Sequence, residues 1–125
     1  MKIRKEIYFL SDFHLGAPDR EASLLREKHI VKFLDEIKND ASHIFILGDL
    51  FDFWYEYKKV VPKGFVRILG KLAELTDSGI IIKFFVGNHD MWMNGYFESE
   101  LGIEVFHKPQ EFEFIGKNFF IELSF

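Results

Sequence analysis

The sequence has 125 residues, of which 48% are hydrophobic and 29% charged, with a formal net charge of −4 at pH 7. This length and composition fit one folded domain and exclude a disordered tail, and the acidic balance argues against a general polyanion-binding protein. Because cysteine is absent, disulfides, thiolate metal sites and a cysteine nucleophile are also excluded.

Short apolar segments alternate with amphipathic ones over the first two thirds of the sequence. Runs that are apolar and rich in β-formers predict three buried strands, over residues 7–10, 43–47 and 80–86. Apolar residues at helical spacing predict one helix over 21–38 and a second that begins near Pro62 and ends at Gly79. This alternation predicts a parallel sheet with right-handed crossovers, and the continuous apolar runs predict a sheet covered on both faces.

The order of elements changes after the third strand. Residues 95–101 predict a short helix and residues 103–106 a strand, and 111–115 with 119–123 predict a hairpin. We therefore expect residues 1–125 to form a single α/β domain of order β-α-β-α-β, followed by a short helix and a hairpin.

Polar side chains follow each of the three predicted parallel strands. Asp12 and His14 follow the first strand, Gly48-Asp49 the second, and Gly87-Asn88-His89-Asp90 the third. In an open α/β sheet, ligands bind beyond the carboxyl ends of the strands, so we expect these loops to meet at one edge.

These side chains carry the donor atoms of a metal site. Carboxylate and imidazole groups suit Mn²⁺, Fe²⁺ or Zn²⁺. Residues i and i+2 of an extended segment point the same way, so Asp12 and His14 can hold one ion, and Asp49 has two oxygens with which to bridge two ions. Each motif alone also occurs in ordinary turns and helix caps, whereas the three together, each after a buried strand, predict a metal site.

The segments 11–16, 48–54 and 87–92 resemble the first three motifs of the calcineurin-like metallophosphoesterases. Within that family they are most similar to the branch that hydrolyses UDP-2,3-diacylglucosamine. The resemblance extends over essentially the whole chain, which corresponds to the N-terminal half of such an enzyme. It implies a four-layer αββα sandwich, of which this chain would supply the N-terminal half. It also implies pyrophosphate hydrolysis that gives UMP and 2,3-diacylglucosamine 1-phosphate, a step of lipid A biosynthesis.

The resemblance also implies a role for each motif residue. Asp12 and His14 would ligate the first of two divalent cations, Asp49 would bridge both, and Asn88 would ligate the second. Mn²⁺ is the usual cation of this branch. Together with Asn88, His89 would be catalytic, facing the phosphate and stabilising its charge.

Other residues near the motifs have two interpretations each. Asp90 could hold His89 in one tautomer, and Asp52 could orient a neighbour or lie in solvent. The aromatic residues Trp54, Tyr55 and Trp92 could form a rim for acyl chains or pack the loops against the core. A lipid-bearing substrate would bring a cytoplasmic protein into peripheral contact with the inner face of the inner membrane.

The family uses further histidine motifs that this sequence does not contain. After His89 the only histidine is His107, which matches neither the later Gly-His motif nor the final His-x-His motif. We therefore expect a truncated phosphoesterase that binds at most one Mn²⁺ tightly, has little diphosphatase activity, and self-associates through unpaired strand edges.

Two alternatives stay open at the level of sequence. The chain could be an inactive fragment or interaction remnant of this fold, or a metallophosphoesterase acting on another phosphodiester or nucleotide. The acidic balance and the lack of a basic stripe argue against a nucleic acid partner.

Overall fold

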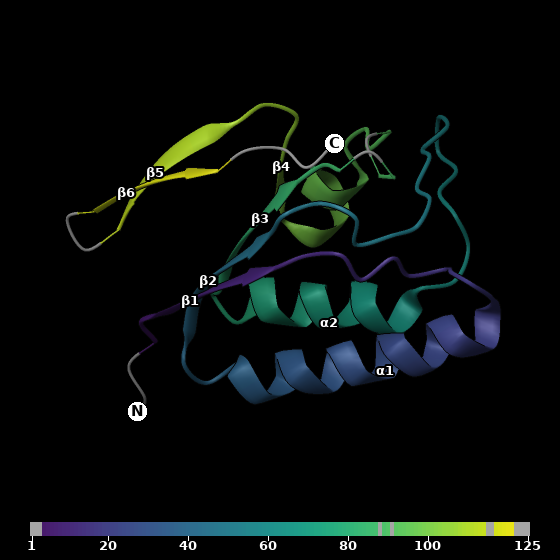
Figure 1. The fold of residues 1–125 in the computed structure, drawn as a ribbon, viewed down its shortest axis with the longest axis horizontal. Coiled ribbons are helices and arrows are strands. Elements are labelled where there is room, and N and C mark those ends of the chain that lie inside the picture. Colours follow the sequence, from purple (N-terminus) through teal and green to yellow (C-terminus); the bar gives the residue numbers. More distant parts are fainter. Residues whose placement is uncertain (1–3, 88, 91, 115–116, 122–125) are drawn as a thin grey trace.

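The computed structural model describes residues 4–87, 89–90, 92–114 and 117–121, and from residue 110 onward it describes only the backbone. Figure 1 shows the elements, which follow one another along the chain as β1 (Glu6–Leu10), α1 (Arg20–Ile37), β2 (Ala41–Ile46), α2 (Val66–Asp77), β3 (Ile81–Phe85), η1 (Phe97–Leu101), β4 (Glu104–Phe106), β5 (Gln110–Phe114) and β6 (Lys117–Ile121). Strands β1 to β4 form one parallel sheet in the order β1-β2-β3-β4, and β5 pairs with β6 as an antiparallel hairpin. The predicted parallel β-α-β-α-β arrangement is confirmed.

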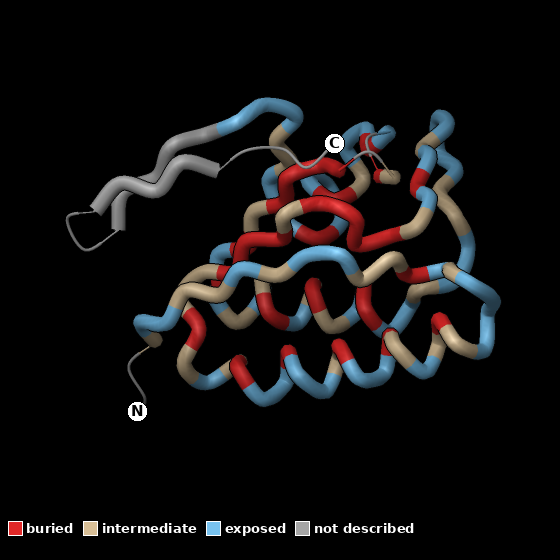
Figure 2. The backbone as a smooth tube through the Cα atoms, in the orientation of Figure 1, coloured by how far each residue is buried: buried red, intermediate tan, exposed pale blue. Residues whose placement is uncertain are grey.

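The two long helices cover one face of the sheet. Because the strand order follows the chain order, right-handed crossovers in one direction place α1 and α2 on the same side, where they pack against each other (Figure 1). Their apolar sides bury Leu34 of α1 and Leu72 of α2 against Ile44 of the central strand. Figure 2 shows this core as buried positions that recur on the sides of the helices facing the sheet.

The opposite face of the sheet is also apolar. Phe45 of β2 and Phe85 of β3 are fully buried there, in a smaller cluster with Ile7 and Phe106. The Phe85 and Phe106 rings stack with their centroids 4.9 Å apart. The central strands therefore bury side chains on both faces, which explains their nearly continuous apolar sequence.

The second helix begins four residues later than the sequence predicts. Helix α2 starts at Val66 and not near Pro62, because Gly64 and Phe65 both have a positive φ, of 93° and 59°, that interrupts helical geometry. The buried Glu27 carboxylate of α1 accepts a hydrogen bond from the backbone N–H of Ile68 at 2.9 Å, which satisfies a donor of the first turn. A contact between two helices thus decides where α2 starts.

The remaining predictions differ only in detail. The short helix predicted over 95–101 is a single π-helical turn, η1, which packs against α2 and β4. The hairpin forms, although the predicted residues 115–116 and 122–123 lie outside the described residues. Among the described residues, no helix is both long enough and apolar enough to cross a membrane.

Two leucines on α1 test how much the helix–sheet core contributes to stability. Leu34→Ala removes a side chain that is 1% exposed and leaves a cavity, so we expect it to lower the free energy of unfolding by about 2–5 kcal/mol. Leu25→Ala, at a side chain that is 59% exposed, should change it by less than about 0.5 kcal/mol. Urea unfolding followed by circular dichroism measures both, and equal losses would contradict this assignment of the core.

Candidate metal centre

Three loops meet beyond the carboxyl ends of β1, β2 and β3. They are the first loop (residues 11–19), the second loop (47–65) and the third loop (86–96). The second loop lies between the other two, because His14 donates its backbone N–H to the Asp49 carbonyl at 2.9 Å and Trp54 donates to the His89 carbonyl at 3.2 Å. Backbone pairing thus continues past the ends of the strands and brings together residues about 75 positions apart in sequence.

Asp12, His14 and Asp49 form the first group of donor atoms at this edge. One atom from each residue lies within 4.8 Å of the other two, and His14 Nε2 is 3.9 Å from Asp12 Oδ1. Two atoms bound about 2.1 Å from one ion lie at most about 4.2 Å apart, so shifts of a few tenths of an ångström would allow all three to share an ion. Carboxylate oxygen and imidazole nitrogen are donors that suit Mn²⁺, Fe²⁺ or Zn²⁺, and the group therefore fits a divalent cation.

The backbone of these three residues is not the extended chain that the two-residue spacing suggested. Five non-glycine residues of the described chain have a positive φ, and three of them are Asp12, His14 and Asp49, at 62°, 46° and 53°. Left-handed backbone, and not a strand-like alternation, brings Asp12 near His14. Such conformations cost about 1–3 kcal/mol each and cluster at functional sites, so the strain is concentrated on the candidate ligands.

Two glycines allow the second and third loops to approach each other closely. A Cβ at Gly48, whose φ is 89°, would lie 2.9 Å from the Gly87 Cα, and a Cβ at Gly87 would overlap Asp49 Oδ1. This close approach lets Asp49 Oδ1 accept the backbone N–H of His89 at 3.2 Å. Any larger residue at position 87 would displace the carboxylate of a candidate ligand.

A fully buried carboxylate, that of Asp90, holds the third loop against the second. It accepts backbone N–H groups from Gly87 at 2.8 Å, Leu50 at 2.9 Å, Asp49 at 3.3 Å and Phe51 at 3.4 Å. Burial raises the pKa of the Asp90 carboxyl, whereas the N–H donors act in the opposite direction. Asp90 therefore organises the backbone that carries Asp49.

The tautomer of His89 depends on Asp52 and not on Asp90, the residue that sequence analysis proposed for this role. His89 Nδ1 lies 2.9 Å from the Asp52 carbonyl oxygen. A carbonyl can only accept, so Nδ1 carries a proton and Nε2 is the nitrogen left for other contacts. The printed partners of Asp90 are all backbone N–H groups.

Asp52 also lies beside His14. Its Oδ1 is 3.5 Å from His14 Nδ1 and 3.8 Å from His89 Nδ1, and these three residues form a second group of donors within 4.8 Å. Because His89 Nδ1 is protonated, His89 could join an ion there only through Nε2. Asp52 is also placed to accept from His14 Nδ1, as carboxylates beside metal-bound histidines do, which leaves His14 Nε2 for the first group.

The aromatic residues near the loops divide into buried and exposed ones. Trp54 is fully buried, stacks on Phe51 with centroids 4.4 Å apart, and donates its Nε1–H to Glu56 Oε2 at 2.9 Å. It packs the second loop against the core and cannot belong to a rim. Tyr55 and Trp92 are 47% and 46% exposed, and their ring centroids lie 6.4 Å apart.

One predicted site residue and one residue outside the predicted rim need separate mention. Asn88, expected to ligate a second cation, lies outside the described residues. Phe53 is exposed with its ring centroid 6.0 Å from that of Trp92, which places it beside the two exposed aromatics. Residues 53–55 are all aromatic, so only the structure distinguishes the exposed Phe53 and Tyr55 from the buried Trp54.

Substituting Asp90 tests its organising role. Asp90→Asn keeps one acceptor oxygen but turns an NH₂ group toward backbone N–H donors, so we expect the free energy of unfolding to fall by roughly 1–3 kcal/mol. Asp77→Asn, an exposed position at the end of α2, is the matched control and should change it by less than about 0.5 kcal/mol. If both variants unfold in urea like the unmodified chain, the Asp90 carboxylate does not hold the loops together.

Comparisons with known proteins identify the family of this chain. A family model described as calcineurin-like phosphoesterase matches residues 5–122. The chain is 44% identical over 117 residues to a UDP-2,3-diacylglucosamine hydrolase of Porphyromonas gingivalis, covering 94% of this chain and 45% of that protein. It is 34% identical over 102 residues to the protein of that name from Aliivibrio fischeri, covering 79% of this chain and 39% of the relative. The chain thus spans less than half the length of these relatives.

Solved structures show the same fold. A Pseudomonas putida nuclease matches 84% of this chain and 49% of its own, with a TM-score of 0.55 at 20% identity. An Aquifex aeolicus protein of unknown function matches 91% of this chain and 57% of its own, with a TM-score of 0.57 at 21% identity. The motif order, the parallel sheet, the convergent donor groups and the family match lead to one conclusion: the chain belongs to the calcineurin-like phosphoesterase family.

Proposed function

We propose that this chain carries the metal-binding loops of a UDP-2,3-diacylglucosamine hydrolase. In this reaction water adds to one phosphorus of the pyrophosphate and the bridging P–O bond breaks, which gives UMP and 2,3-diacylglucosamine 1-phosphate. The observation that carries the proposal is the convergence of Asp12, His14 and Asp49, with donor atoms within 4.8 Å, at the edge of a phosphoesterase fold. The 44% identity to a relative of that name supports the substrate class.

The cation site would be formed by residues of all three loops. Asp12, His14 and Asp49 would hold one cation, and Asp49 with Asn88 would contribute to a second. Mn²⁺ is the ion we propose, with Zn²⁺ or Fe²⁺ as the ions of next-best fit to these donors. A bound divalent cation would supply Lewis-acid polarisation of a phosphate oxygen and lower the pKa of a water molecule.

The residues of the chain itself would orient the substrate and handle a proton. Asp52 would accept from His14 Nδ1 and so direct Nε2 toward the cation, which fits the 3.5 Å separation between them. His89, whose Nδ1 donates to the Asp52 carbonyl, would present Nε2 to a phosphate oxygen and, when protonated, donate to it as charge develops. The net charge of −4 is no obstacle, since bound cations would be the dominant local charges.

The exposed aromatic side chains would contact the acyl groups of the substrate. Phe53, Tyr55 and Trp92 lie on the second and third loops, beside the candidate ligands and accessible to solvent. Exposed apolar groups beside a polar centre suit a ligand with a charged head and acyl chains. We propose that they bring the protein into peripheral contact with the cytoplasmic face of the inner membrane.

Cation binding can be measured on this chain directly. We expect Mn²⁺ titration of the 125-residue protein, followed by calorimetry, to give one tight site. Asp49→Asn should weaken it at least about 10-fold, because substitutions that only orient a ligand already cost about 10–100-fold. Asp77→Asn removes the same charge away from the site and should leave affinity unchanged. Equal affinity in Asp49→Asn and the unmodified chain would contradict the assigned ligands.

Hydrolysis is best tested in a longer protein. The 125-residue chain alone should release little UMP, because it provides few ligands for a second cation. A chimera in which this chain replaces the matched segment of the Porphyromonas gingivalis relative should hydrolyse UDP-2,3-diacylglucosamine, and Asp49→Asn in the chimera should abolish this. A single-stranded oligonucleotide is the comparison substrate; cleavage of the oligonucleotide without cleavage of the lipid nucleotide would favour the alternative of a different phosphodiester substrate.

A further inference from the structure

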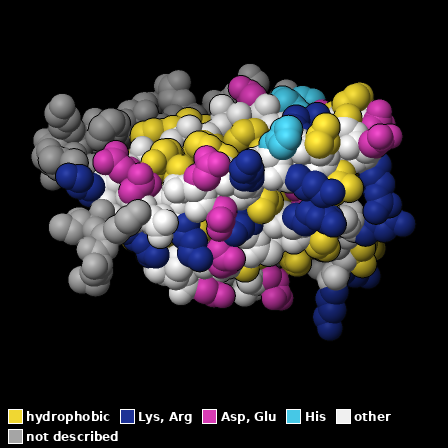
Figure 3. All heavy atoms as spheres, turned by 90° about the horizontal axis from the view of Figure 1, so that it is seen from below, with side chains coloured by type: hydrophobic (Ala, Val, Ile, Leu, Met, Phe, Trp, Pro, Cys, Tyr) yellow, Lys and Arg dark blue, Asp and Glu magenta, His cyan; other side chains and the backbone are white. Residues whose placement is uncertain are grey.

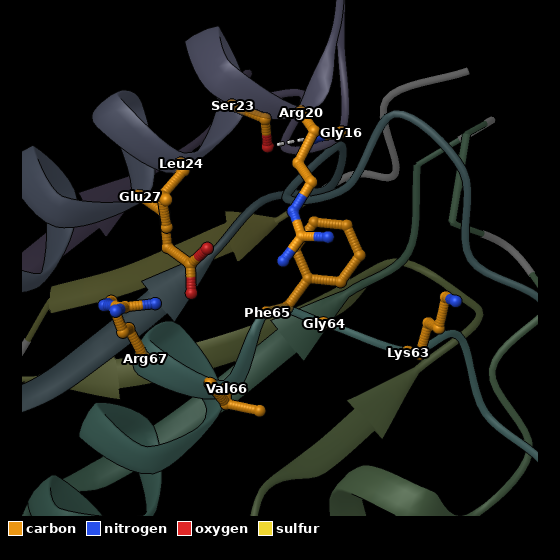
Figure 4. A pocket seen from close by; sticks show the side chains of 10 residues that line it. All are labelled: Gly16, Arg20, Ser23, Leu24, Glu27, Lys63, Gly64, Phe65, Val66 and Arg67. Atoms are coloured by element: carbon orange, nitrogen blue, oxygen red, sulfur yellow. Dashed lines mark hydrogen bonds between the residues drawn. The ribbon is translucent and has the colours of Figure 1, made fainter.

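A cavity of about 410 Å³ lies between the first turns of α1 and the loop that leads into α2. Figure 4 shows it, with Arg20, Ser23 and Glu27 contributed by α1 and Lys63 and Arg67 by the segment around the start of α2. None of these residues belongs to the motifs of the candidate metal centre. The cavity therefore needs an explanation of its own.

Positive charge surrounds this cavity. Arg20, Lys63 and Arg67 line it, and none of the three makes an ion pair or a side-chain hydrogen bond with another residue in the described part of the chain. Figure 3 shows Lys and Arg side chains gathered at the end of the molecule where α1 begins. Three unpaired cations around one cavity of an acidic protein favour an anionic occupant.

Two buried polar side chains line the same cavity. Ser23 is 5% exposed, and its Oγ accepts the backbone N–H of Gly16 at 2.7 Å, so its own proton has no acceptor among the described residues. Glu27 is 3% exposed and uses Oε2 to accept from Ile68. The cavity thus offers a hydroxyl donor and a carboxylate acceptor in addition to the cations.

We propose that this cavity is a second binding site, for the phosphate group of a small phosphorylated ligand. The guanidinium groups of Arg20 and Arg67 hold the phosphate oxygens, since Arg pairs with phosphate through two parallel hydrogen bonds. Ser23 donates its hydroxyl proton to the same phosphate. Glu27 accepts from a hydroxyl or N–H group of the organic part, and its negative charge selects a phosphate monoester that carries such donors over inorganic phosphate.

The site is separate from the metal centre but adjacent to it. Gly16 lines the cavity, and a Cβ placed on it would lie 3.6 Å from Phe65 Cζ and 4.0 Å from the Cβ of Asp52, the residue beside His14. The cavity is therefore a close neighbour of the metal loops. Phosphate binding in this cavity is distinct from the proposed hydrolysis and requires neither a cation nor turnover at the metal loops.

Calorimetric titration of metal-free protein with glucose 1-phosphate tests the proposal. Arg20→Gln and Arg67→Gln should each weaken binding at least about 5-fold, as expected for loss of a charged hydrogen bond. Lys32→Gln removes one positive charge from an exposed position further along α1 and should change affinity less than about 2-fold. Because all three positions are exposed, the variants should fold like the unmodified chain, which circular dichroism checks.

The Glu27→Gln variant and a titration with inorganic phosphate distinguish a phosphate ester from free phosphate as the ligand. In the unmodified chain glucose 1-phosphate should bind more tightly than inorganic phosphate, and glucose should not bind. The Glu27→Gln variant keeps an oxygen for the Ile68 N–H but removes the negative charge that repels phosphate. Inorganic phosphate should therefore bind this variant more tightly, and the difference in affinity between glucose 1-phosphate and inorganic phosphate should become smaller.

Four results would overturn the inference. The first is that Arg20→Gln and Arg67→Gln bind glucose 1-phosphate as tightly as the unmodified chain, and the second is that Lys32→Gln loses as much affinity as they do. The third is that Asp49→Asn no longer binds glucose 1-phosphate, and the fourth is that an oligonucleotide binds more tightly than glucose 1-phosphate. Loss in Asp49→Asn would assign the anion to the metal loops. Phosphate binding that persists while Mn²⁺ binding and hydrolysis fail would uphold this inference and reject only the proposed function.

Discussion

The buried carboxylate of Asp90 is the contact on which the geometry of the candidate metal centre depends. Its side chain has no exposed surface, and the free-energy cost of burying a charged carboxylate without hydrogen-bond partners would be very large. Backbone N–H groups from both the second and the third loop converge on it, including that of Asp49. A single side chain thus sets the relative position of two loops that come from different strands, and with it the position of Asp49 beside His89.

The backbone of the candidate ligands is strained, and hydrogen bonds between the loops hold it in that conformation. Asp12, His14 and Asp49 all have a left-handed backbone conformation, which residues other than glycine rarely adopt. Hydrogen bonds that continue the parallel pairing beyond the strand ends, such as His14 to Asp49, hold these conformations in place. The rigid sheet therefore fixes the donor atoms before any ligand binds, which is the arrangement expected of a preorganised centre.

The charge distribution reconciles an acidic chain with anionic ligands. The net charge is −4, yet Arg20, Lys63 and Arg67 line one cavity, and a group of donors that fits a divalent cation lies in the neighbouring loops. Under the two proposals, side chains would supply the local positive charge in the cavity and bound cations would supply it at the loops. The exposed aromatics beside the metal loops add apolar contact for the rest of a ligand.

Chain order and local periodicity were enough to predict much of this protein from its sequence. Apolar strands alternating with amphipathic helices determine a parallel sheet, and a parallel sheet brings the loops after its strands to one edge, so Asp12, His14 and Asp49 could be grouped in advance. The left-handed backbone at Asp12 and His14 could not be predicted, because it depends on pairing with the second loop.

Only the tertiary structure decided the start of α2, the burial of Trp54 and the pairing of His89 with Asp52. The contact from Glu27 to Ile68 joins residues 41 positions apart, and that from His89 to Asp52 joins residues 37 apart. Local sequence patterns extend over a few residues, so they carry no information on which distant side chain satisfies a given backbone group. Those details follow from how the helices and loops pack once the sheet has formed.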